Sequence, residues 1–215
     1  MLTRIFTTQR LAHRVVQVYD AAGEGWRDLT PLCVPRHDHG LVTVSDRIYA
    51  LGGLDSAEQQ LSSVERYDPS TDEWSVFAEM PTGKHSFGCA VVKGLIYLVG
   101  GFSGPDRAKT SSVEVFNPVT KMWTEAASLA TPRVWLRCVE LQGKLYAIGG
   151  EDHLPEPVDT VSIYDPATNG WAAGPGMSEK RSSPACCVLA DRIYVTGGDD
   201  DSDTRLASVE VSAPP

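Results

Sequence analysis

One stretch of this sequence contains every element of the pattern that decides the fold. Residues 47–74 read RIYALGGLDSAEQQLSSVERYDPSTDEW. A short apolar run ends in Gly52-Gly53, a polar loop follows, and a second alternating run leads through Asp68-Pro69 to Trp74. Short runs separated by glycine and proline turns predict β-strands rather than helices.

The same elements recur at a spacing of 48 or 49 residues, so the chain is a repeat protein. A valine also recurs five times, at Val16, Val64, Val113, Val161 and Val209. Four residue types with one shared period exclude a coincidence, and we interpret the recurring residues as structural. They are the diglycines Gly52-Gly53, Gly100-Gly101, Gly149-Gly150 and Gly197-Gly198, the tryptophans Trp26, Trp74, Trp123 and Trp171, and the tyrosines Tyr49, Tyr97, Tyr146 and Tyr194.

Each unit reads as four short antiparallel strands. In the second unit they are 41–44, 48–51, 63–67 and a fourth strand with Trp74. A two-residue turn joins the first two strands, and the Lys93-Gly94 copy places glycine where such a turn needs positive φ. The Asp-Pro sequence between the third and fourth strands favours a type I turn.

This pattern resembles the Kelch repeat. The matching features are the diglycine after an Ile-Tyr or Leu-Tyr strand, the Tyr-Asp-Pro turn, the downstream tryptophan, and a basic residue that opens each next unit: Arg36, Lys84, Arg133 and Arg181. The resemblance implies an all-β, Kelch-type β-propeller, in which each unit forms one four-stranded blade. A blade cannot bury its faces alone, so neighbouring blades would share the core.

The repeat divides the chain, as one Kelch-repeat domain over 1–215, into three complete units and two incomplete ones. We expect an incomplete repeat at 1–35, repeats at 36–83, 84–132 and 133–180, and an incomplete repeat at 181–215. Two interpretations follow: a partial ring from a longer protein or short isoform, or a small closed ring whose N-terminal strands complete the last blade. We favour the partial ring, because the strand at Val209 would be superfluous in the small one.

Composition narrows the classes of partner. The net charge of −9 disfavours binding to nucleic acid or to an anionic membrane. An odd number of cysteines, five, and the absence of a recognisable secretory signal argue against a disulfide framework and lead us to expect a cytoplasmic protein. We expect no cofactor and no metal.

Departures from the repeat are the best candidates for binding a partner, because loops carry function on such scaffolds. In Kelch adaptors the partner peptide is held by the residue after the diglycine and by the residue after the basic position. Carried over, the resemblance implies a partner-binding loop face. The first class is Leu54, Phe102, Glu151 and Asp199, the second is His37, His85, Val134 and Ser182, and only Phe102 and Ser182 match the family's usual residues.

Trp135 and Arg137 are the sharpest local anomaly, since the other repeats carry small or polar residues there. Residues two apart on a strand share a face, so we expect these two side chains to project together. Both residue types are enriched at interface hot spots. The alternative is that they fill a gap beside missing blades.

Three further groups favour structural interpretations. His37-Asp38-His39 places two histidines on one face of a strand edge, but too few ligands accompany them for zinc. Cys89, Cys138 and Cys186 occupy one repeat position and are interpreted as core fillers. The acidic run Asp199-Asp200-Asp201-Asp203 is interpreted as a solvated loop, with attraction of a basic peptide or cation as the alternative.

The amino-acid sequence of the repeats is most similar to that of the substrate-recognition propellers of BTB–Kelch adaptors for cullin-type ubiquitin ligases. This resemblance implies a non-catalytic module that binds a protein or peptide on its loop face, and that meets the cullin only through a BTB domain absent from this sequence. An actin-binding Kelch protein is the first alternative. A propeller enzyme, similar to galactose oxidase or the sialic acid mutarotases, is less favoured, because no matching copper or triad residues are evident.

Overall fold

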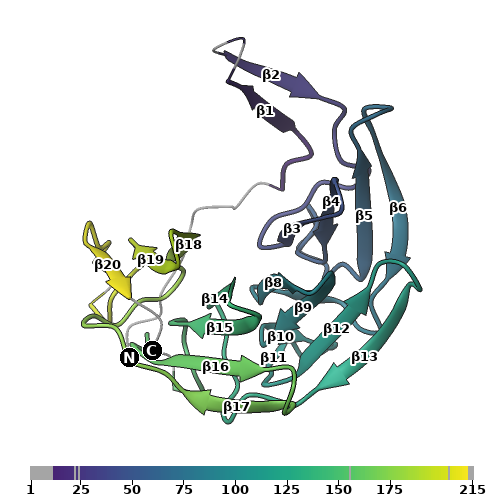
Figure 1. The fold of residues 1–215 in the computed structure, drawn as a ribbon. Helices are drawn as coiled ribbons and strands as arrows, with labels where there is room; N and C mark the ends of the chain where they lie inside the picture. The colour runs from purple at the N-terminus through teal and green to yellow at the C-terminus, as the bar shows by residue number, and fades with distance from the viewer. Residues whose placement is uncertain (1–11, 22, 24, 155, 203, 213–215) are drawn as a thin grey trace.

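The computed structural model describes residues 12–21, 23, 25–154, 156–202 and 204–212, and in these residues it is built from β-strands without a helix. Figure 1 shows the sheets as blades of an arc, with the first strand of each fuller blade (β3, β8, β14 and β18) turned toward a common centre. These inner strands contact one another in order around the arc. The prediction of a partial ring of antiparallel blades is confirmed. No helix suited to crossing a membrane occurs in the described residues.

Three sheets are complete four-stranded blades with sequential antiparallel pairing. They are β3 (Gly40–Val44), β4 (Arg47–Leu51), β5 (Ser63–Asp68) and β6 (Glu73–Glu79); β8 (Gly88–Val92), β9 (Leu95–Val99), β12 (Val113–Asn117) and β13 (Met122–Ala126); and β14 (Arg137–Leu141), β15 (Lys144–Ile148), β16 (Val161–Asp165) and β17 (Gly170–Ala173).

The two end sheets have fewer strands in the described part of the chain. β1 (Val16–Asp20) pairs with β2 (Gly25–Leu29), while β18 (Ala185–Leu189), β19 (Arg192–Thr196) and β20 (Val209–Ser212) form a three-stranded sheet. Because β20 takes the third place beside β19, β1 and β2 do not complete that blade. In the described residues β1 and β2 pair only with each other, so they do not complete the last blade in the way that the small closed ring requires.

The two-residue turns between the first and second strands have positive φ at both positions. Ser45 and Asp46 have φ of 46° and 59°, and Lys93 and Gly94 have φ of 50° and 78°. This is the signature of a type I′ turn, which matches the twist of the strands it joins. The tight turns are confirmed, although the sequence pointed to glycine alone as the left-handed residue.

The diglycine is required by the close approach of two backbone segments, one from the next repeat and one from its own repeat. Gly52 and Gly53 have φ of 57° and 95°. A Cβ at Gly52 would lie 2.4 Å from the carbonyl oxygen of Lys84, and one at Gly53 would lie 2.6 Å from the carbonyl oxygen of His37. No other residue fits at these two positions without moving backbone, which supports the structural interpretation of the diglycine.

The recurring tryptophans pack beside the aromatic residue that ends the third strand. Ring centroids lie 5.3 Å apart for Tyr67–Trp74, 4.7 Å for Phe116–Trp123 and 5.2 Å for Tyr164–Trp171. Each pair joins a hydrophobic cluster that includes residues of the preceding repeat. Trp171 also donates a 2.7 Å hydrogen bond from Nε1 to the carbonyl oxygen of Ala127.

Trp26 is the exception among the four repeat tryptophans. It keeps its partner Tyr19, at a centroid distance of 5.4 Å, yet it is 69% exposed. Trp26 therefore contributes little to the core of the described residues. The physical reason is that, in the described residues, no preceding blade covers this face of the β1–β2 sheet.

Candidate functional site

The loops after the diglycines are tied to the segments after the basic residues by short β-bridges. In one repeat this forms a small sheet of β7 (Lys84–His85), β10 (Phe102–Ser103) and β11 (Ala108–Lys109). The two predicted residue classes are thereby brought together in all four repeats. The directly paired residues are His37 with Leu54, His85 with Phe102, Val134 with Glu151, and Ser182 with Asp199.

Only part of this loop face is accessible. Leu54, His85 and Ser182 are buried, at 4%, 7% and 6% exposure, and Val134 is fully buried. These four side chains pack beneath the accessible surface of the loop face. Half-buried side chains remain for contact with a partner, namely His37, Phe102, Trp135, Glu151 and Asp199, and Arg137 is exposed.

Three rings form an aromatic cluster, which we define as His85, Phe102 and Trp135. His85 stacks on Phe102 at a centroid distance of 5.0 Å, and Trp135 meets Phe102 edge-on at 5.3 Å. Desolvation lowers the pKa of His85 to about 4, so this imidazole is neutral near pH 7 and packs as an apolar ring. The cluster joins two successive repeats into one apolar surface feature.

Trp135 lies on the inner rim of the arc, where consecutive repeats are linked by backbone hydrogen bonds. Ser86 donates its N–H to Asp38, Trp135 to Ser86, and Ser183 to Trp135, with N···O distances of 2.9, 2.8 and 2.9 Å. All four residues have φ between 52° and 55°. We call this series the rim chain.

The prediction that Trp135 and Arg137 share one strand face is wrong. Trp135 precedes the strand with a left-handed φ of 53°, and β14 begins only at Arg137. Alternation of faces holds within a strand and does not extend through a left-handed residue. Trp135 consequently packs on Phe102, whereas Arg137 donates from Nη1 to the carbonyl oxygen of Leu136 at 3.4 Å.

Polar contacts beside the aromatic cluster involve residues that the repeat pattern did not single out. Lys109, opposite Phe102 in the β10–β11 pair, lies 3.6 Å from Glu151 and donates to the carbonyl oxygen of Asp152 at 2.7 Å. Glu58 lies 3.2 Å from the Nε2 of His37. Lys109 and Glu58 lie in the variable loops after the diglycines. Their place in these loops was the only feature of the sequence that could have marked them as site residues.

The acidic loop is organised by its own backbone. The Asp200 carboxylate accepts hydrogen bonds from the N–H groups of Ser202 and Thr204, both at 2.8 Å. Asp201 is exposed, and Asp203 lies outside the described residues. These local contacts support the interpretation of a solvated loop.

Neither the histidines nor the cysteines form a chemical site. Asp38 has a φ of 52°, so His37 and His39 do not share a strand face as predicted, and the described residues contain no group of metal-ligating side chains. Burial raises the pKa of Cys89 to about 11 and of Cys186 to about 12, and raises that of Cys138 well above the usual range. Protonated thiols on the inner strands suit the predicted role of core fillers.

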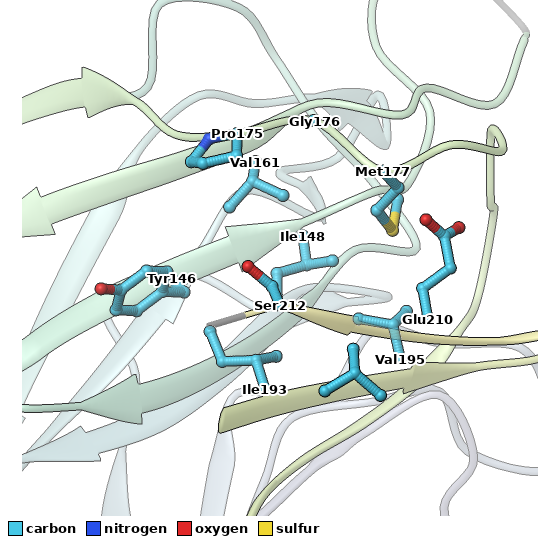
Figure 2. Close-up of a pocket in the computed structure, with 11 residues that line it drawn as sticks. Tyr146, Ile148, Val161, Pro175, Gly176, Met177, Ile193, Val195, Glu210 and Ser212 are labelled. Atoms are coloured by element: carbon cyan, nitrogen blue, oxygen red, sulfur yellow. The ribbon is translucent and has the colours of Figure 1, made fainter. Parts of the chain in front are cut away.

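An apolar pocket of about 140 Å³ opens between the third complete blade and the last sheet. Figure 2 shows Tyr146, Ile148 and Val161 on one side and Ile193, Val195 and Glu210 on the other. At the preceding interface the pair Tyr164 and Trp171 fills the corresponding place. Ser212 stands at the repeat position of Tyr164, so a smaller side chain accounts for part of the space. We interpret this pocket as a packing feature of the last sheet.

Comparison with known proteins agrees with this geometry. The family model described as the KLHDC2/KLHL20/DRC7 Kelch-repeats domain matches residues 7–198. The chain belongs to the Kelch-repeat family. As such a domain, it is a protein-interaction module built on a β-propeller scaffold.

Relatives and solved structures add two further similarities. Kelch-like protein 7 from Rattus norvegicus, Gallus gallus and Homo sapiens is 48% identical over 48 residues, a match that spans 20% of this chain and 8% of each relative. The solved structure of YjhT superimposes with a TM-score of 0.81 at 13% identity, covering 93% of this chain and 73% of that one. At this identity the likeness shows the fold alone.

Proposed function

We propose that this chain recognises a protein partner through its loop face, with the aromatic cluster as the apolar anchor of the contact. The observation that carries the proposal is the half-buried pair Phe102 and Trp135, held edge to face across two repeats. Aromatic side chains that are already fixed lose little entropy on binding, and they dominate the energy of many interfaces. Glu151, Asp199 and His37 supply polar contacts around this anchor.

The finer form of the proposal is substrate recognition for a cullin-type ubiquitin ligase, in the cytoplasm and without catalysis. The similarity to Kelch-like protein 7 supports this choice of pathway. In that role the loop face holds the substrate, and a BTB domain contributes the contact with the cullin. Actin binding is the alternative that the same experiment separates.

The experiment is affinity purification of the tagged chain from its source cell, followed by mass spectrometry, with Trp135→Ala and Phe102→Ala as test variants. Val119→Ala is the matched control, because Val119 is 90% exposed in the turn at the opposite edge of its blade. We expect both test variants to lose a protein that the wild type and the control retain, by at least about tenfold in recovery.

Circular dichroism must first show that all variants are folded. Retention of every partner by both folded test variants would remove the aromatic cluster from the interface. A retained set dominated by actin, unchanged by proteasome inhibition, would favour the cytoskeletal alternative.

A further inference from the structure

The basic residue that opens each repeat is buried and reaches the third strand of its own repeat. In three repeats it meets a carboxylate there. Arg36 lies 2.5 Å from Glu65, Lys84 lies 2.9 Å from Glu114, and Arg181 lies 3.1 Å from Glu210. In these three repeats the buried cation and the carboxylate balance each other's charge inside the protein.

In two of these repeats, backbone N–H groups also bind the carboxylate. Glu65 accepts hydrogen bonds from the N–H of Cys33 at 2.7 Å and of Val34 at 3.0 Å. Glu210 accepts one from the N–H of Ser178 at 2.6 Å. Cys33 and Ser178 both precede the basic residue by three positions, so the cation and these donors form the same cradle in these two repeats, whereas Pro81, which has no N–H, stands at that position before Lys84.

The repeat at 133–180 keeps the cradle but lacks the acid. Arg133 is 6% exposed, and Ser162 stands at the position of Glu65, Glu114 and Glu210. The guanidinium of Arg133 makes only long contacts, 3.4 Å from Nη2 to the Ser162 hydroxyl and 3.4 Å from Nη1 to the Ala147 carbonyl. Its buried Nε has no hydrogen-bond partner among the described residues, and the same is true of the Nε of Arg36.

The backbone N–H groups of this cradle also have no acceptor in the described residues. Ala130 and Thr131 correspond to Cys33 and Val34, and neither donates its N–H within the portion of the chain that the structure describes. Ala130 is exposed and Thr131 half-buried, so a small ion has access from solvent. The nearby Asp152 carboxylate favours the charged form of Arg133 through space. Its own hydrogen bond comes from the N–H of Leu154.

Burial opposes the charge of Arg133 and lowers its pKa, but a guanidinium does not lose its proton in proteins. Asp152 favours this charge from a distance, and an anion in direct contact would balance it further. Replacing glutamate by serine removes a methylene and the carboxylate group and leaves a hydroxyl. The Ser162 side chain is therefore smaller than the glutamate of the other repeats by roughly a carboxylate group.

We propose that the Arg133 cradle, formed by the Arg133 guanidinium, the N–H groups of Ala130 and Thr131 and the Ser162 hydroxyl, binds a small monovalent anion of the size of chloride or formate. The anion takes the place that the glutamate carboxylate holds in the other three repeats. This site is independent of partner recognition on the loop face.

The test is thermal unfolding of the full chain in sodium chloride, sodium formate and sodium gluconate at equal ionic strength. Gluconate is too large for the cradle and serves as the reference anion. We expect chloride or formate to raise the Tm of the wild type by about 2–4 °C over gluconate, the shift given by a ligand well above its Kd in a protein of this size. The arm with the larger shift identifies the preferred anion.

The control variant is Ser162→Glu, which restores the residue of the other repeats. Its Tm in gluconate should exceed that of the wild type, and its difference between the salts should vanish. Ser162→Gln fills the same volume without charge and should lose the anion dependence while lowering the Tm. If Ser162→Glu does not fold, Ser162→Ala is the second variant, and it should reduce the salt difference because it removes the Ser162 hydroxyl from the cradle.

Direct binding is measured by the line width of the chloride NMR signal, which the wild type should broaden and formate should restore. Equal Tm values of the wild type in all three salts, without chloride broadening, overturn the proposal. A salt difference that persists unchanged in Ser162→Glu also overturns it, since the anion would then act elsewhere.

Discussion

The first sheet and the first complete blade carry the same aromatic pair in two different environments. Tyr19–Trp26 and Tyr67–Trp74 have nearly equal ring separations, 5.4 and 5.3 Å. Yet Trp74 is 8% exposed and Trp26 is 69% exposed, because Leu32, Val16 and Leu29 cover the former pair. The repeat sequence sets the pairing of the rings, whereas the preceding repeat decides whether the pair is buried.

The largest expected effect in this comparison is at the covered ring. Trp74→Ala should lower the free energy of unfolding by about 3–5 kcal/mol, because it leaves a cavity at a repeat interface. Chemical denaturation monitored by the remaining tryptophan fluorescence and by circular dichroism measures the change. A loss below about 1 kcal/mol would mean that the neighbouring repeat closes over the cavity, and that burial at this interface contributes little.

The second prediction concerns the pH dependence of stability that follows from burial of the His85 ring. The folded-state pKa of His85 is about 4, below its ordinary value of 6.5, so burial favours the neutral form. The stabilising contribution is complete above about pH 6.5 and is lost as the pH falls through about 4. His85→Phe removes this titration, so its Tm should fall less than that of the wild type between pH 6.5 and 4.

The matched control is His153→Phe, because the His153 side chain is 61% exposed and makes no packed ring contact in the described residues. Its Tm should follow the wild type across the same pH range. Parallel acid curves for the wild type and His85→Phe would show that carboxylates alone account for the loss of stability in acid.

The smallest effect belongs to the uncovered ring. Trp26→Ala should change the free energy of unfolding by no more than about 0.5 kcal/mol, as is usual for exposed positions. The same denaturation experiment measures it beside Trp74→Ala. A loss comparable to that of Trp74→Ala would mean that Trp26 is covered in solution, by another segment or a second molecule.

Sequence alone predicts the blades well because each turn has a local signature. The diglycine and the Asp68-Pro69 turn encode their geometry within a few residues, and the Asp68 side chain indeed accepts from the N–H of Ser70 at 2.9 Å. The rim chain was not predictable in this way. Its left-handed residues are Asp38, Ser86, Trp135 and Ser183, and none is the glycine that usually marks positive φ.

The candidate site was predicted in part for the same reason. Pairing of Phe102 with His85 follows from the repeat, since each residue occupies a fixed position in it. The contact of Phe102 with Trp135 crosses between repeats and depends on the left-handed rim residue, which no periodicity reveals. The absent acid at Ser162 was visible in the sequence, because Glu65, Glu114 and Glu210 mark the position, but its meaning required the partners of Glu65 and Glu210.

The rim chain has a consequence for how such a protein can diversify. It couples successive repeats through main-chain hydrogen bonds, to which the Ser86 hydroxyl adds a 3.4 Å hydrogen bond to the Asp38 carboxylate. Aspartate, serine and tryptophan all occupy these positions without altering the hydrogen bonds. Substitutions can therefore change the side chains at the inner rim one at a time, while the backbone hydrogen bonds between repeats are kept.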